Sequence, residues 1–455
     1  LGNYRITDLD IAVEGDGFQI AREMANQLTS KASFVALGKE NRIGRVVVSG
    51  ISPNVIVDVS SFKGPTITKD LLARDFTINS IASHLWDVIN GRINQAILDP
   101  LNGKKDIENR IIRICGIDSF REDPLRMLRA FRFSSQLNFN IHHDTLAQIR
   151  KFAELIKNVS GERVRDELAI VFGSNQSAKI VEQMAHNLLF WEVFPELLPT
   201  RGFEQNSFHH LDVWGHTIEA LENLENIVGN MPGFFGHFSE KVHDYVYEQI
   251  VSGRPRLWLL KLAVLYHDSG KPFSLQVLGH QRRFIGHEKI SKSLFVQAGS
   301  RIKLGSRELS EVVSWVEGHM KSSILSMENV SKRALFRLFQ RFGTNSIGLV
   351  LLYLADLNAA RGHARNANEF ARAKQGANKF IELVFQHEIA PVKPLLDGFE
   401  LMTEFGLEQG PRLGSIIRWL VTEQALGNIK NREQAKEAIS RYISRHPSST
   451  NKKEI

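Results

Sequence analysis

The chain has 455 residues, of which 43% are hydrophobic and 24% are charged. A single core rarely grows beyond about 250–300 residues, so several domains are expected, and this ordinary composition excludes disorder over most of the chain. The single cysteine, Cys115, excludes an internal disulfide and fits a reducing, cytoplasmic location. The apolar runs at 257–266 and 347–355 are too short to span a bilayer and predict buried helices. A net charge of +7 is a mild indication of a polyanionic partner.

The N-terminal part of the chain has the pattern of an α/β domain. Apolar, β-branched runs at 33–37, 44–49 and 54–60 predict strands, with Gly, Pro and Asn between them. Residues 17–30 have helical spacing, and 75–84 has the pattern of a helix start followed by an apolar face.

Strand signals stop after about residue 116, and the remainder is predicted to be helical as far as about residue 445. Pro195, Pro199 and Gly202 mark a boundary within it. The helices expected before that boundary cover 122–136, 144–157, 161–172 and 178–187. Residues 110–165 carry eleven Lys or Arg against six Asp or Glu, which fits a solvated helical face or a polyanion-binding surface equally well.

Three aspartates in predicted strands form a candidate catalytic site. Asp8 and Asp10 flank Leu9, and the two-residue period of a strand puts both carboxylates on one face. Asp58 lies in another apolar strand, VIVDVSS. Three carboxylates on adjacent strands suit Mg²⁺ and in-line phosphoryl transfer, in which one ion activates a 3′-hydroxyl and another neutralises a triphosphate. Asp-x-Asp by itself is more often an exposed strand end.

A strand-to-helix junction supplies candidate nucleotide-binding residues. In LARDFTINSIA, residues 72–82, the side chains of Arg74, Asp75 and Asn79 are expected to be exposed. An arginine, a carboxylate and an amide at such a junction can bind phosphate and ribose. The alternative is that Asp75 only caps the helix.

The helix predicted at 122–136 supplies a candidate base-reading pair. Asp123 and Arg126 are three residues apart and would share a face, with Arg129 one turn further on. A carboxylate accepts from the amino group of cytosine or adenine, and an arginine donates to the adjacent unprotonated ring nitrogen. Guanine and uracil present the reverse pattern, so one such pair could select CTP and ATP without a template. The alternative is an ordinary ion pair on a helix surface.

Five motifs occur in order along the chain: DLDIAVEG, RDFTINSIA, LDPLNGKKDIENRIIR, REDPLRMLRAFRFS and SGERVRDEL. Together they resemble the bacterial tRNA nucleotidyltransferase and poly(A) polymerase family, the class II CCA-adding enzymes of the polymerase β-like superfamily. The resemblance implies an α+β fold with an α/β head and a helical neck, body and tail. These parts are predicted at residues 1–115, 116–200, 201–375 and 376–455.

The implied activity is template-independent addition of CMP or AMP, from CTP or ATP, to the 3′ end of tRNA. The resemblance makes Asp8 and Asp10 the Mg²⁺ ligands and Asp58 the third carboxylate. It assigns ribose, phosphate and base binding to the candidates above: Arg74, Asp75, Asn79, Asp123, Arg126 and Arg129. It also implies that Glu162, Arg163 and Arg165 brace the neck helices and that the tail binds tRNA.

Three departures from the family pattern affect these expectations. Only seven residues precede Asp8, and they lack the family's Gly-rich turn and Arg-Asp pair, so the chain is expected to be truncated at its N-terminus. Ala73 stands where many members have arginine. Only 15 residues separate Asp58 from Arg74, which resembles enzymes that add CC or A alone. The poly(A) polymerase branch is less expected because ALGKENRIGRVVV stands in place of its basic stretch.

A second candidate metal site lies on predicted helices in the middle of the chain. Its residues are His216, His267, Asp268, His287, His319 and Asp356. This order resembles the HD superfamily of metal-dependent phosphohydrolases. Imidazole and carboxylate ligands suit Mn²⁺, Ni²⁺, Fe²⁺ or Zn²⁺, and a metal-bound water could attack a phosphate ester, with Lys271 as a phosphate contact.

Related tRNA nucleotidyltransferases carry such a domain with phosphatase or 2′,3′-cyclic phosphodiesterase activity. A phosphohydrolase whose main activity resides at this site is therefore an alternative function. Two further alternatives are an HD domain that only shapes the tRNA-binding body, and an RNA-binding protein whose head has lost its activity.

Overall fold

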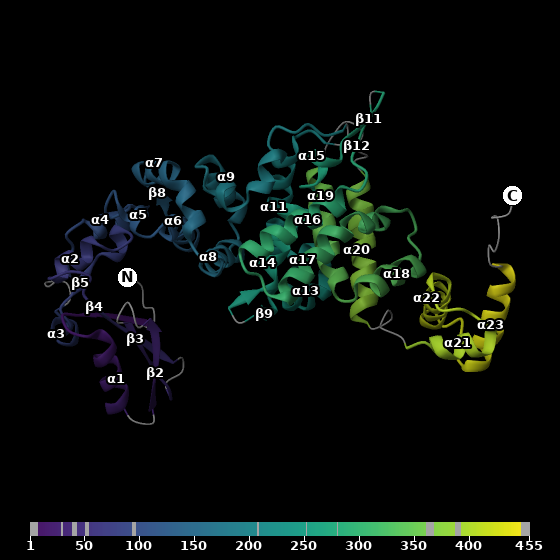
Figure 1. The fold of residues 1–455 in the computed structure, drawn as a ribbon, viewed down its shortest axis with the longest axis horizontal. Coiled ribbons are helices and arrows are strands. Elements are labelled where there is room, and N and C mark those ends of the chain that lie inside the picture. Colours follow the sequence, from purple (N-terminus) through teal and green to yellow (C-terminus); the bar gives the residue numbers. More distant parts are fainter. Residues whose placement is uncertain are drawn as a thin grey trace. The chain divides into compact units, whose positions relative to one another are not determined.

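The computed structural model describes residues 8–28, 31–38, 43–50, 54–92, 97–206, 209–251, 253–279, 281–360, 368–386 and 393–446. The chain forms two compact units: unit 1 is Leu1–Val159 with Asn187–Leu189, and unit 2 is Ser160–His186 with Phe190–Ile455. Unit 1 combines a sheet with helices and unit 2 is almost entirely helical (Figure 1), so the predicted α+β class is confirmed. The division into four domains stays a prediction. Within the described residues, no helix has both the length and the apolarity needed to cross a membrane.

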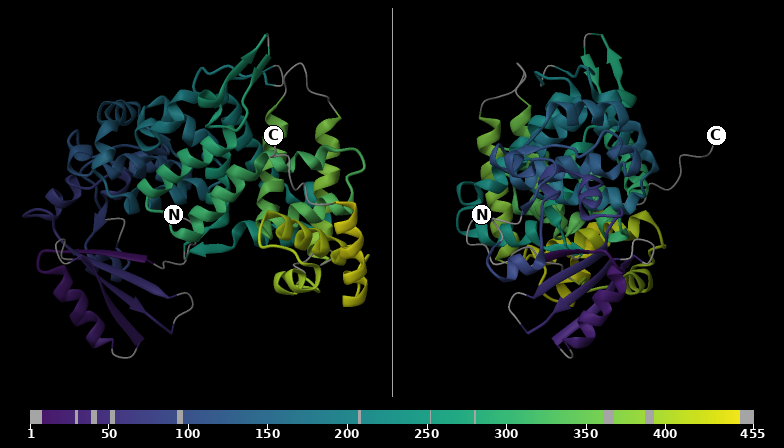
Figure 2. Two further views of the ribbon diagram at one scale, coloured as in Figure 1. Left: turned by 45° about the vertical axis from the view of Figure 1, so that its right-hand side comes forward. Right: turned by 90° about the vertical axis from the view of Figure 1, so that its left-hand side faces the viewer.

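The sheet of unit 1 has four strands in the order β1-β4-β3-β2. They are β1 (Asp8–Val13), β2 (Ala32–Gly38), β3 (Ile43–Val48) and β4 (Val55–Ser61), and they confirm the strands predicted there. β1 runs parallel to β4, whereas β3 is antiparallel to both β2 and β4. Helix α1 (Gly17–Gln27), capped by the Asp16 carboxylate, lies along one face of the sheet (Figures 1 and 2).

The core of this α/β layer forms between α1 and the inward positions of the strands. It contains Ala21, Ala25, Val46, Val57 and Val59. A Cβ atom on Gly44 would lie 2.4 Å from the Cβ of Ala21, so the close approach of α1 to β3 requires glycine there. Because one face of the sheet packs on α1, alternate residues of each strand point to the other face.

The rest of unit 1 consists of helices, 3₁₀ segments and two-residue strands. They are α2 (Ile67–Leu72), the 3₁₀ turn η2 (Thr77–Asn79), β5 (Ala82–Ser83), α3 (Leu85–Ile89), β6 (Ile97–Leu98), α4 (Gly103–Glu108), β7 (Ile111–Ile112), α5 (Ser119–Glu122), α6 (Leu125–Leu137), β8 (Asn140–Ile141), α7 (His143–Phe152) and the 3₁₀ helix η4 (Ala153–Asn158).

The helix predicted at 75–84 is wrong. The segment is a 3₁₀ turn followed by a short strand, because its backbone pairs with a distant segment. Phe76 forms a bridge with Ile114, and the Thr77 amide donates to the Arg113 carbonyl at 2.9 Å.

The prediction that strands stop after residue 116 is also wrong, since β8 and four short strands of unit 2 follow. Such two- and three-residue strands depend on distant partners and leave no periodic pattern.

Unit 2 begins with α8 (Gly161–Gly173), α9 (Ser177–His186), α10 (Leu189–Val193), whose first residue belongs to unit 1, and the 3₁₀ helix η5 (Pro195–Thr200). Its middle contains α11 (Val213–Gly229), α12 (Met231–Phe235), η6 (Gly236–Phe238), α13 (Ser239–Tyr247), β9 (Gln249–Val251), β10 (Arg254–Pro255), α14 (Arg256–Tyr266), α15 (Lys271–Ser274), β11 (Gln276–Leu278), β12 (Gln281–Arg283), α16 (His287–Arg301), α17 (Ser306–Gly318) and η7 (His319–Ser326). It ends with α18 (Lys332–Phe342), α19 (Asn345–Ala359), α20 (Glu369–Phe385), α21 (Gly398–Phe405), α22 (Pro411–Ala425) and α23 (Arg432–Arg445).

The two apolar runs predicted to be buried helices form α14 and α19. Every residue of α14 is buried, and so is nearly all of α19. A Cβ atom on Gly348 would lie 2.4 Å from Nε1 of Trp315, so α19 approaches α17 closely at this glycine. Of the predicted metal ligands, Asp356 lies on α19, and His267 and Asp268 directly follow α14. The most buried helices of the unit therefore position three of these ligands.

Candidate active site and metal centre

The three aspartates of the head lie on one face of its sheet. In the parallel pairing of β1 with β4, Asp10 is opposite Asp58, and Asp8 precedes Asp10 by one strand period. Val57 and Val59, the neighbours of Asp58 in β4, point into the core beneath α1. The aspartates therefore share the face turned away from α1, where Asp8 and Asp10 are exposed and Asp58 is half-buried.

A basic residue that the sequence reasoning missed, Arg45, lies beside this trio. It stands opposite Asp58 in the β3–β4 pairing, and its Nε and Nη2 donate to the two Asp58 oxygens at 2.7 Å each. The hydrogen bond to Asp58 is the main cause that raises the pKa of Arg45, and the charges of Asp58, Asp8 and Asp10 add to it. The sequence signal that could have identified Arg45 is a single cationic residue within the apolar strand IGRVVV.

The arrangement of the trio fits a hard cation, although its carboxylates do not form a tight cage. The described groups of three or more ligand side chains whose donor atoms all lie within 4.8 Å of one another do not include it. Asp8 and Asp10 present oxygen ligands to solvent, which suits a Mg²⁺ ion that retains several waters. Asp58 is shared with Arg45, so its carboxylate is oriented by a bidentate pair.

Asp75 connects the RDFTINS segment to helix α6. Its Oδ2 accepts hydrogen bonds from Nε and Nη2 of Arg129 at 2.9 and 2.7 Å, and its Oδ1 accepts from the Phe76 amide and from Asn79 Nδ2. Burial acts to raise the pKa of Asp75, but the charge of Arg129 and these hydrogen bonds outweigh burial and lower it. Asp75 was expected to be exposed; it is only 8% exposed because it binds these partners.

Arg74 lies close to the same segment. Its Nε donates to Oδ2 of the buried Asp70 at 3.2 Å, and its Nη1 donates to the Asn79 carbonyl at 3.3 Å. The Lys63 amide donates to the other oxygen of Asp70 at 2.9 Å. The structure therefore brings Arg74, Asp75 and Asn79 together, with Arg74 retaining 29% side-chain exposure.

The prediction that Asp123 and Arg126 share a helix face is wrong. Asp123 ends α5 with extended backbone angles, φ −144° and ψ 98°, because the proline that follows disfavours the helical conformation at the residue before it. Arg126 lies on α6 and is 7% exposed. Its Nη1 donates to Ser119 Oγ at 2.7 Å and its Nη2 to the Ala73 carbonyl at 3.1 Å, so protein groups fix the guanidinium.

Arg165, one of the residues expected to brace the neck helices, contacts the predicted body. Its Nη1 donates to the Lys303 carbonyl at 2.7 Å, which ties α8 to the turn between α16 and α17. The bracing roles of Glu162, Arg163 and Arg165 stay predictions.

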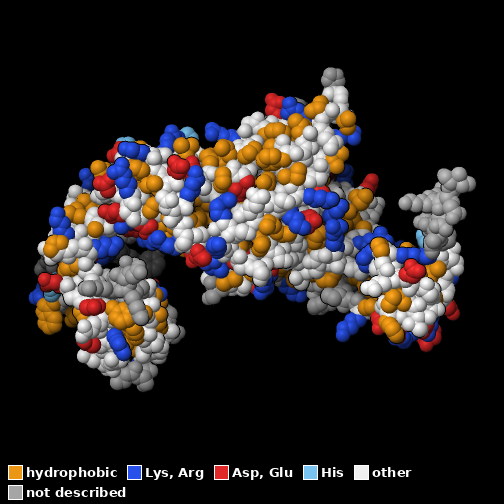
Figure 3. All heavy atoms as spheres, in the orientation of Figure 1, with side chains coloured by type: hydrophobic (Ala, Val, Ile, Leu, Met, Phe, Trp, Pro, Cys, Tyr) orange, Lys and Arg blue, Asp and Glu red, His pale blue; other side chains and the backbone are white. Residues whose placement is uncertain are grey.

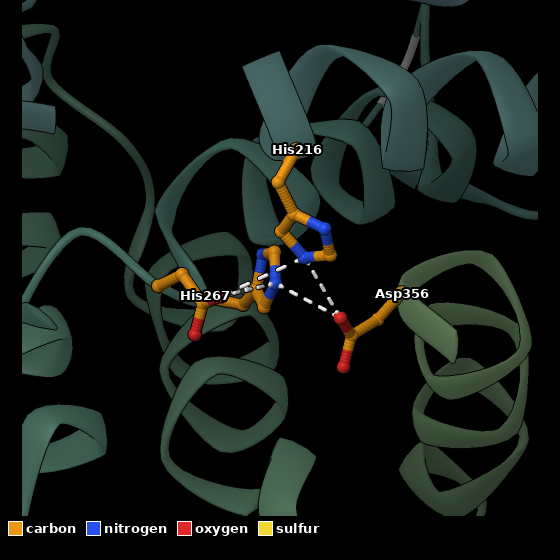
Figure 4. Close-up of side chains that lie close together, drawn as sticks. His216, His267 and Asp356 are labelled. Atoms are coloured by element: carbon orange, nitrogen blue, oxygen red, sulfur yellow. Dashed lines mark hydrogen bonds and ion pairs between the residues drawn. The ribbon is translucent and has the colours of Figure 1, made fainter. Parts of the chain in front are cut away.

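The six residues predicted as the second metal site converge in the middle of unit 2. His216 lies on α11, Asp356 on α19, His267 and Asp268 directly follow α14, and His287 begins α16; His319 begins η7. All are buried except Asp356, whose side chain is 20% exposed. The side chains of His216, His267 and Asp356 point toward one another (Figure 4).

The six predicted ligands divide into two groups that share Asp268, each of which could hold a metal ion. In the first group, His216 Nε2 lies 2.9 Å from Asp356 Oδ1, and His267 Nε2 lies 3.2 Å from Asp268 Oδ2. In the second group, Asp268 Oδ1 lies 3.2 Å from His287 Nε2 and 3.8 Å from His319 Nε2. Each oxygen of Asp268 thus faces a different group of imidazoles.

Backbone carbonyls set the orientation of three of these imidazoles. The Nδ1 atoms of His267, His287 and His319 donate to the carbonyls of Val264, Phe284 and Val316 at 2.7, 2.8 and 2.8 Å. This leaves each Nε2 directed at the cluster, which is the arrangement of metal-binding histidines. Nε2 of His267 is buried and makes no hydrogen bond, although it lies 3.2 Å from Asp268 Oδ2. A metal ion bound by both atoms would fit this arrangement.

The charges of the cluster also favour a bound cation. Burial acts to lower the pKa of His267, but Asp268 and Asp356 outweigh it and raise the pKa to about 10, so a metal ion that binds here displaces a proton and takes its place between these carboxylates. Burial acts to raise the pKa of both carboxyls, but the surrounding positive charges hold them well below their usual range. Burial, aided by the charge of His267, lowers the pKa of His319 to about 4, so its imidazole is neutral, as a metal ligand must be.

Two further side chains border the cluster. Lys271 Nζ lies 2.5 Å from Asp268 Oδ2 and donates to Gln205 Oε1 at 2.6 Å, so the predicted phosphate contact is itself paired with a ligand. His209, which the sequence reasoning missed, packs edge-on against His216 with ring centroids 4.6 Å apart. Burial, and then the charge of Lys271, lower the pKa of His209 to about 3.

Comparisons with known protein families place these sites in context. Residues 1–113 match the model of the poly(A) polymerase head domain, and residues 138–200 match a model described as the probable RNA- and SrmB-binding site of polymerase A. The first match contains the aspartate trio, and the second begins at the end of α6.

Similar proteins cover most of the chain. An A-adding tRNA nucleotidyltransferase of Deinococcus radiodurans is 31% identical over 85% of this chain and 81% of its own length. A CC-adding tRNA nucleotidyltransferase of Geobacter sulfurreducens is 28% identical over 95% of this chain and 87% of its own. The Thermotoga maritima CCA-adding enzyme, solved in complex with tRNA, aligns with 96% of this chain and 87% of its own at a TM-score of 0.59 and 18% identity, which is a likeness of fold.

Proposed function

This chain belongs to the tRNA nucleotidyltransferase and poly(A) polymerase family, and from that premise we propose that it extends tRNA 3′ ends. It transfers CMP, AMP or both from CTP or ATP to the terminal hydroxyl without a template, and pyrophosphate is released. The observation that carries the proposal is the placement of Asp8, Asp10 and Asp58 on one open face of the head sheet. We also propose that it acts in the cytoplasm, in keeping with its free thiol at Cys115.

In this proposal Asp8 and Asp10 hold Mg²⁺, which when bound stabilises the charge that develops on the transferred phosphate. Asp58 stands beside them and is held in one orientation by Arg45, so little side-chain freedom is lost when substrate binds. Arg74 and Asn79, fixed around Asp75, bind ribose and phosphate from the adjoining segment.

Base selection falls to Arg126, with Asp123 reaching from the loop before α6. The Nη1 and Nη2 groups of Arg126 contact Ser119 and Ala73, which fixes the plane of the guanidinium. A guanidinium has five N–H donors, so donors remain for the ring nitrogen of cytosine or adenine. A rigid arginine rejects guanine and uracil because their corresponding nitrogens carry a proton.

The short connection between Asp58 and Arg74 supports addition of only part of CCA. Helix α2 occupies six of its 15 residues. The experiment is incubation of the protein with tRNAs that end before CCA or after CC, with CTP and ATP supplied separately and together, followed by sequencing of the 3′ products. Extension of one tRNA by CC alone, or of the other by A alone, is the expected result. Addition of complete CCA would contradict the restricted specificity, and no extension at all would contradict the proposed function.

We further propose that the cluster around Asp268 binds a divalent transition metal and hydrolyses phosphate esters, with 2′,3′-cyclic RNA ends as candidate substrates. The shared carboxylate, the backbone-oriented imidazoles and the orphaned Nε2 of His267 support this second activity. Mn²⁺, Ni²⁺, Fe²⁺ and Zn²⁺ all suit this ligand set, and the bound ion supplies an activated water.

Metal analysis of the purified protein tests this second activity. The double variant His267→Ala/Asp268→Ala should lose the metal, whereas His243→Ala, which changes an exposed histidine, should retain it. Hydrolysis of cyclic ends should follow the metal and should persist when Asp8 is replaced by alanine. Metal-free wild-type protein that also fails to bind added Mn²⁺ or Zn²⁺ would exclude the proposed centre.

A further inference from the structure

Arg45 belongs to a row of side chains that crosses the open face of the head sheet. In this row Asp10 lies opposite Asp58, and Asp58 lies opposite Arg45. On its other side, in β2, Arg45 lies opposite Val35, which carries no charge. The guanidinium therefore acts on the aspartate side of the row.

The row brings two carboxylates within reach of one cation. Neighbouring strands lie about 4.8 Å apart and a carboxylate binds a divalent ion at about 2.0–2.6 Å, so an ion at Asp10 could also be bound by Asp58. With Asp8 one strand period before Asp10, the trio could form a strong site of three carboxylates. Instead, both oxygens of Asp58 accept from Arg45 at 2.7 Å each. The guanidinium thus occupies the oxygens of Asp58 that a metal ion would use.

Ion pairs between partly exposed side chains are common, and many have no further role. Figure 3 shows acidic side chains scattered among the lysines and arginines over much of the face that it draws. The pair of Arg45 with Asp58 differs because Asp8 and Asp10 also attract the charge of Arg45. It is also open to solvent, since 35% of the Arg45 side chain and 24% of the Asp58 side chain are exposed. A cation from solution therefore competes with Arg45 for Asp58.

We propose that Arg45 is a positioning residue that withholds Asp58 from Mg²⁺, so that the head binds the ion weakly until a nucleoside triphosphate supplies further ligands. The phosphate oxygens of the triphosphate bind the same ion and replace the carboxylate that Arg45 occupies. A head that binds the ion weakly by itself can also release it with pyrophosphate after each transfer. The inference rests on the proposed transfer reaction and concerns how its metal is held.

A purely structural role for Arg45 predicts the opposite change in metal affinity. If Arg45 only stabilised the sheet, its removal would loosen the aspartates and weaken metal binding. If it withholds Asp58, its removal frees a third carboxylate and takes away a positive charge that repels the ion, so metal binding becomes tighter. The sign of the change therefore separates the two roles.

The test is Mn²⁺ binding to the full chain without nucleotide, followed by electron paramagnetic resonance. The head site is the part of this binding that is lost when Asp10→Asn is added to the same protein, which separates it from ions held by the cluster around Asp268. Arg45→Met should lower the Kd of the head site about tenfold, and Arg45→Gln should also lower it. Arg45→Lys, which keeps the charge, should stay within about threefold of wild type.

Arg22→Met is the matched control, because it removes the same charge from an exposed position on α1, the helix that covers the opposite face of the sheet. It should leave the Kd within about twofold of wild type, and a gain equal to that of Arg45→Met would overturn the inference. If wild-type protein extends tRNA but neither Arg45→Met nor Arg45→Gln binds Mn²⁺ more tightly, the inference fails alone. If wild-type protein does not extend tRNA and Asp10→Asn removes no Mn²⁺ from any of these proteins, the proposed function fails with it.

Discussion

The pair formed by Asp75 and Arg129 gives a quantitative test of how the RDFTINS segment is held. The two Arg129 nitrogens lie 2.9 and 2.7 Å from Asp75 Oδ2, with 10% of the Asp75 side chain and 32% of the Arg129 side chain exposed. Breaking a buried pair costs about 3–5 kcal/mol, but solvent screens an arginine that is one-third exposed. Arg129→Met should therefore lower the local free energy of unfolding by about 1.5–3 kcal/mol, the range for hydrogen bonds to charged groups.

Amide hydrogen exchange followed by mass spectrometry measures this local stability. Peptides that contain Thr77 and Cys115 report on it, because the Thr77 amide bonds to Arg113 and the Cys115 amide donates to the Asp75 carbonyl. Their protection factors should fall by about 10- to 150-fold in Arg129→Met, at about 1.4 kcal/mol for each factor of ten. In an Asp75→Asn background the same change should cost less than about 1 kcal/mol. If Arg129→Met lowered the protection factors equally in the wild-type and Asp75→Asn backgrounds, the assignment of this stability to the Asp75–Arg129 pair would be refuted.

The effect also has a defined pH dependence. The pKa of Asp75 is lowered in the folded chain, so its contribution to stability is complete above the unfolded pKa of about 3.9 and is lost as pH falls through the folded value. The difference between wild type and Arg129→Met should therefore be greatest near neutral pH and shrink at acid pH. A difference that grows on acidification would contradict this assignment.

Two other predictions concern the metal cluster and the packing of the head. Asp356→Asn should weaken the first ligand group by at least about 10- to 100-fold in metal affinity while sparing the second, and His319→Ala should do the reverse, as measured by calorimetric titration with Mn²⁺. If both variants lowered the affinity for one and the same ion equally, the division into two ligand groups would be contradicted. Gly103→Ala would place a Cβ atom 2.1 Å from the Thr77 carbonyl and should cost about 1–3 kcal/mol in thermal unfolding, whereas Gly116→Ala, which meets nothing within 4 Å, should be nearly neutral.

The shared face of Asp8 and Asp10 could be predicted because it follows from local periodicity, whereas the place of Asp58 opposite Asp10 depends on the pairing of β1 with β4. Alternation places Asp8 and Asp10 on one face of a strand whatever its partners are. The role of Arg45 could not be predicted in this way, because it depends on the register between β3 and β4. Its position opposite Asp58 is a consequence of non-local pairing, which a one-residue shift would have reversed.

The errors in the nucleotide-binding region have two physical causes. The pattern around Asp123 suggested a continuous helix, but the pre-proline restriction ends α5 there, and this was the one signal in the sequence that could have prevented the error. The helix expected at 75–84 does not form because the backbone of this segment pairs with residues 113–115. This is a tertiary interaction, which local helix propensity does not predict.

The metal cluster shows the same limit. The six residues that converge there could be named as candidate ligands from their order along the chain, but their division around Asp268 depends on how five helical segments pack. The packing also decides that Lys271 faces Asp268 and that His209 borders His216.

Single-turnover incorporation of nucleotide into a tRNA that lacks its 3′ end tests the central claim most directly. Asp10→Asn should reduce the rate at least about 100-fold, while its affinity for tRNA stays at the wild-type value. Glu23→Gln, on the helix that covers the opposite face of the sheet, should leave the rate unchanged. Wild-type incorporation by the Asp10→Asn protein would contradict the account.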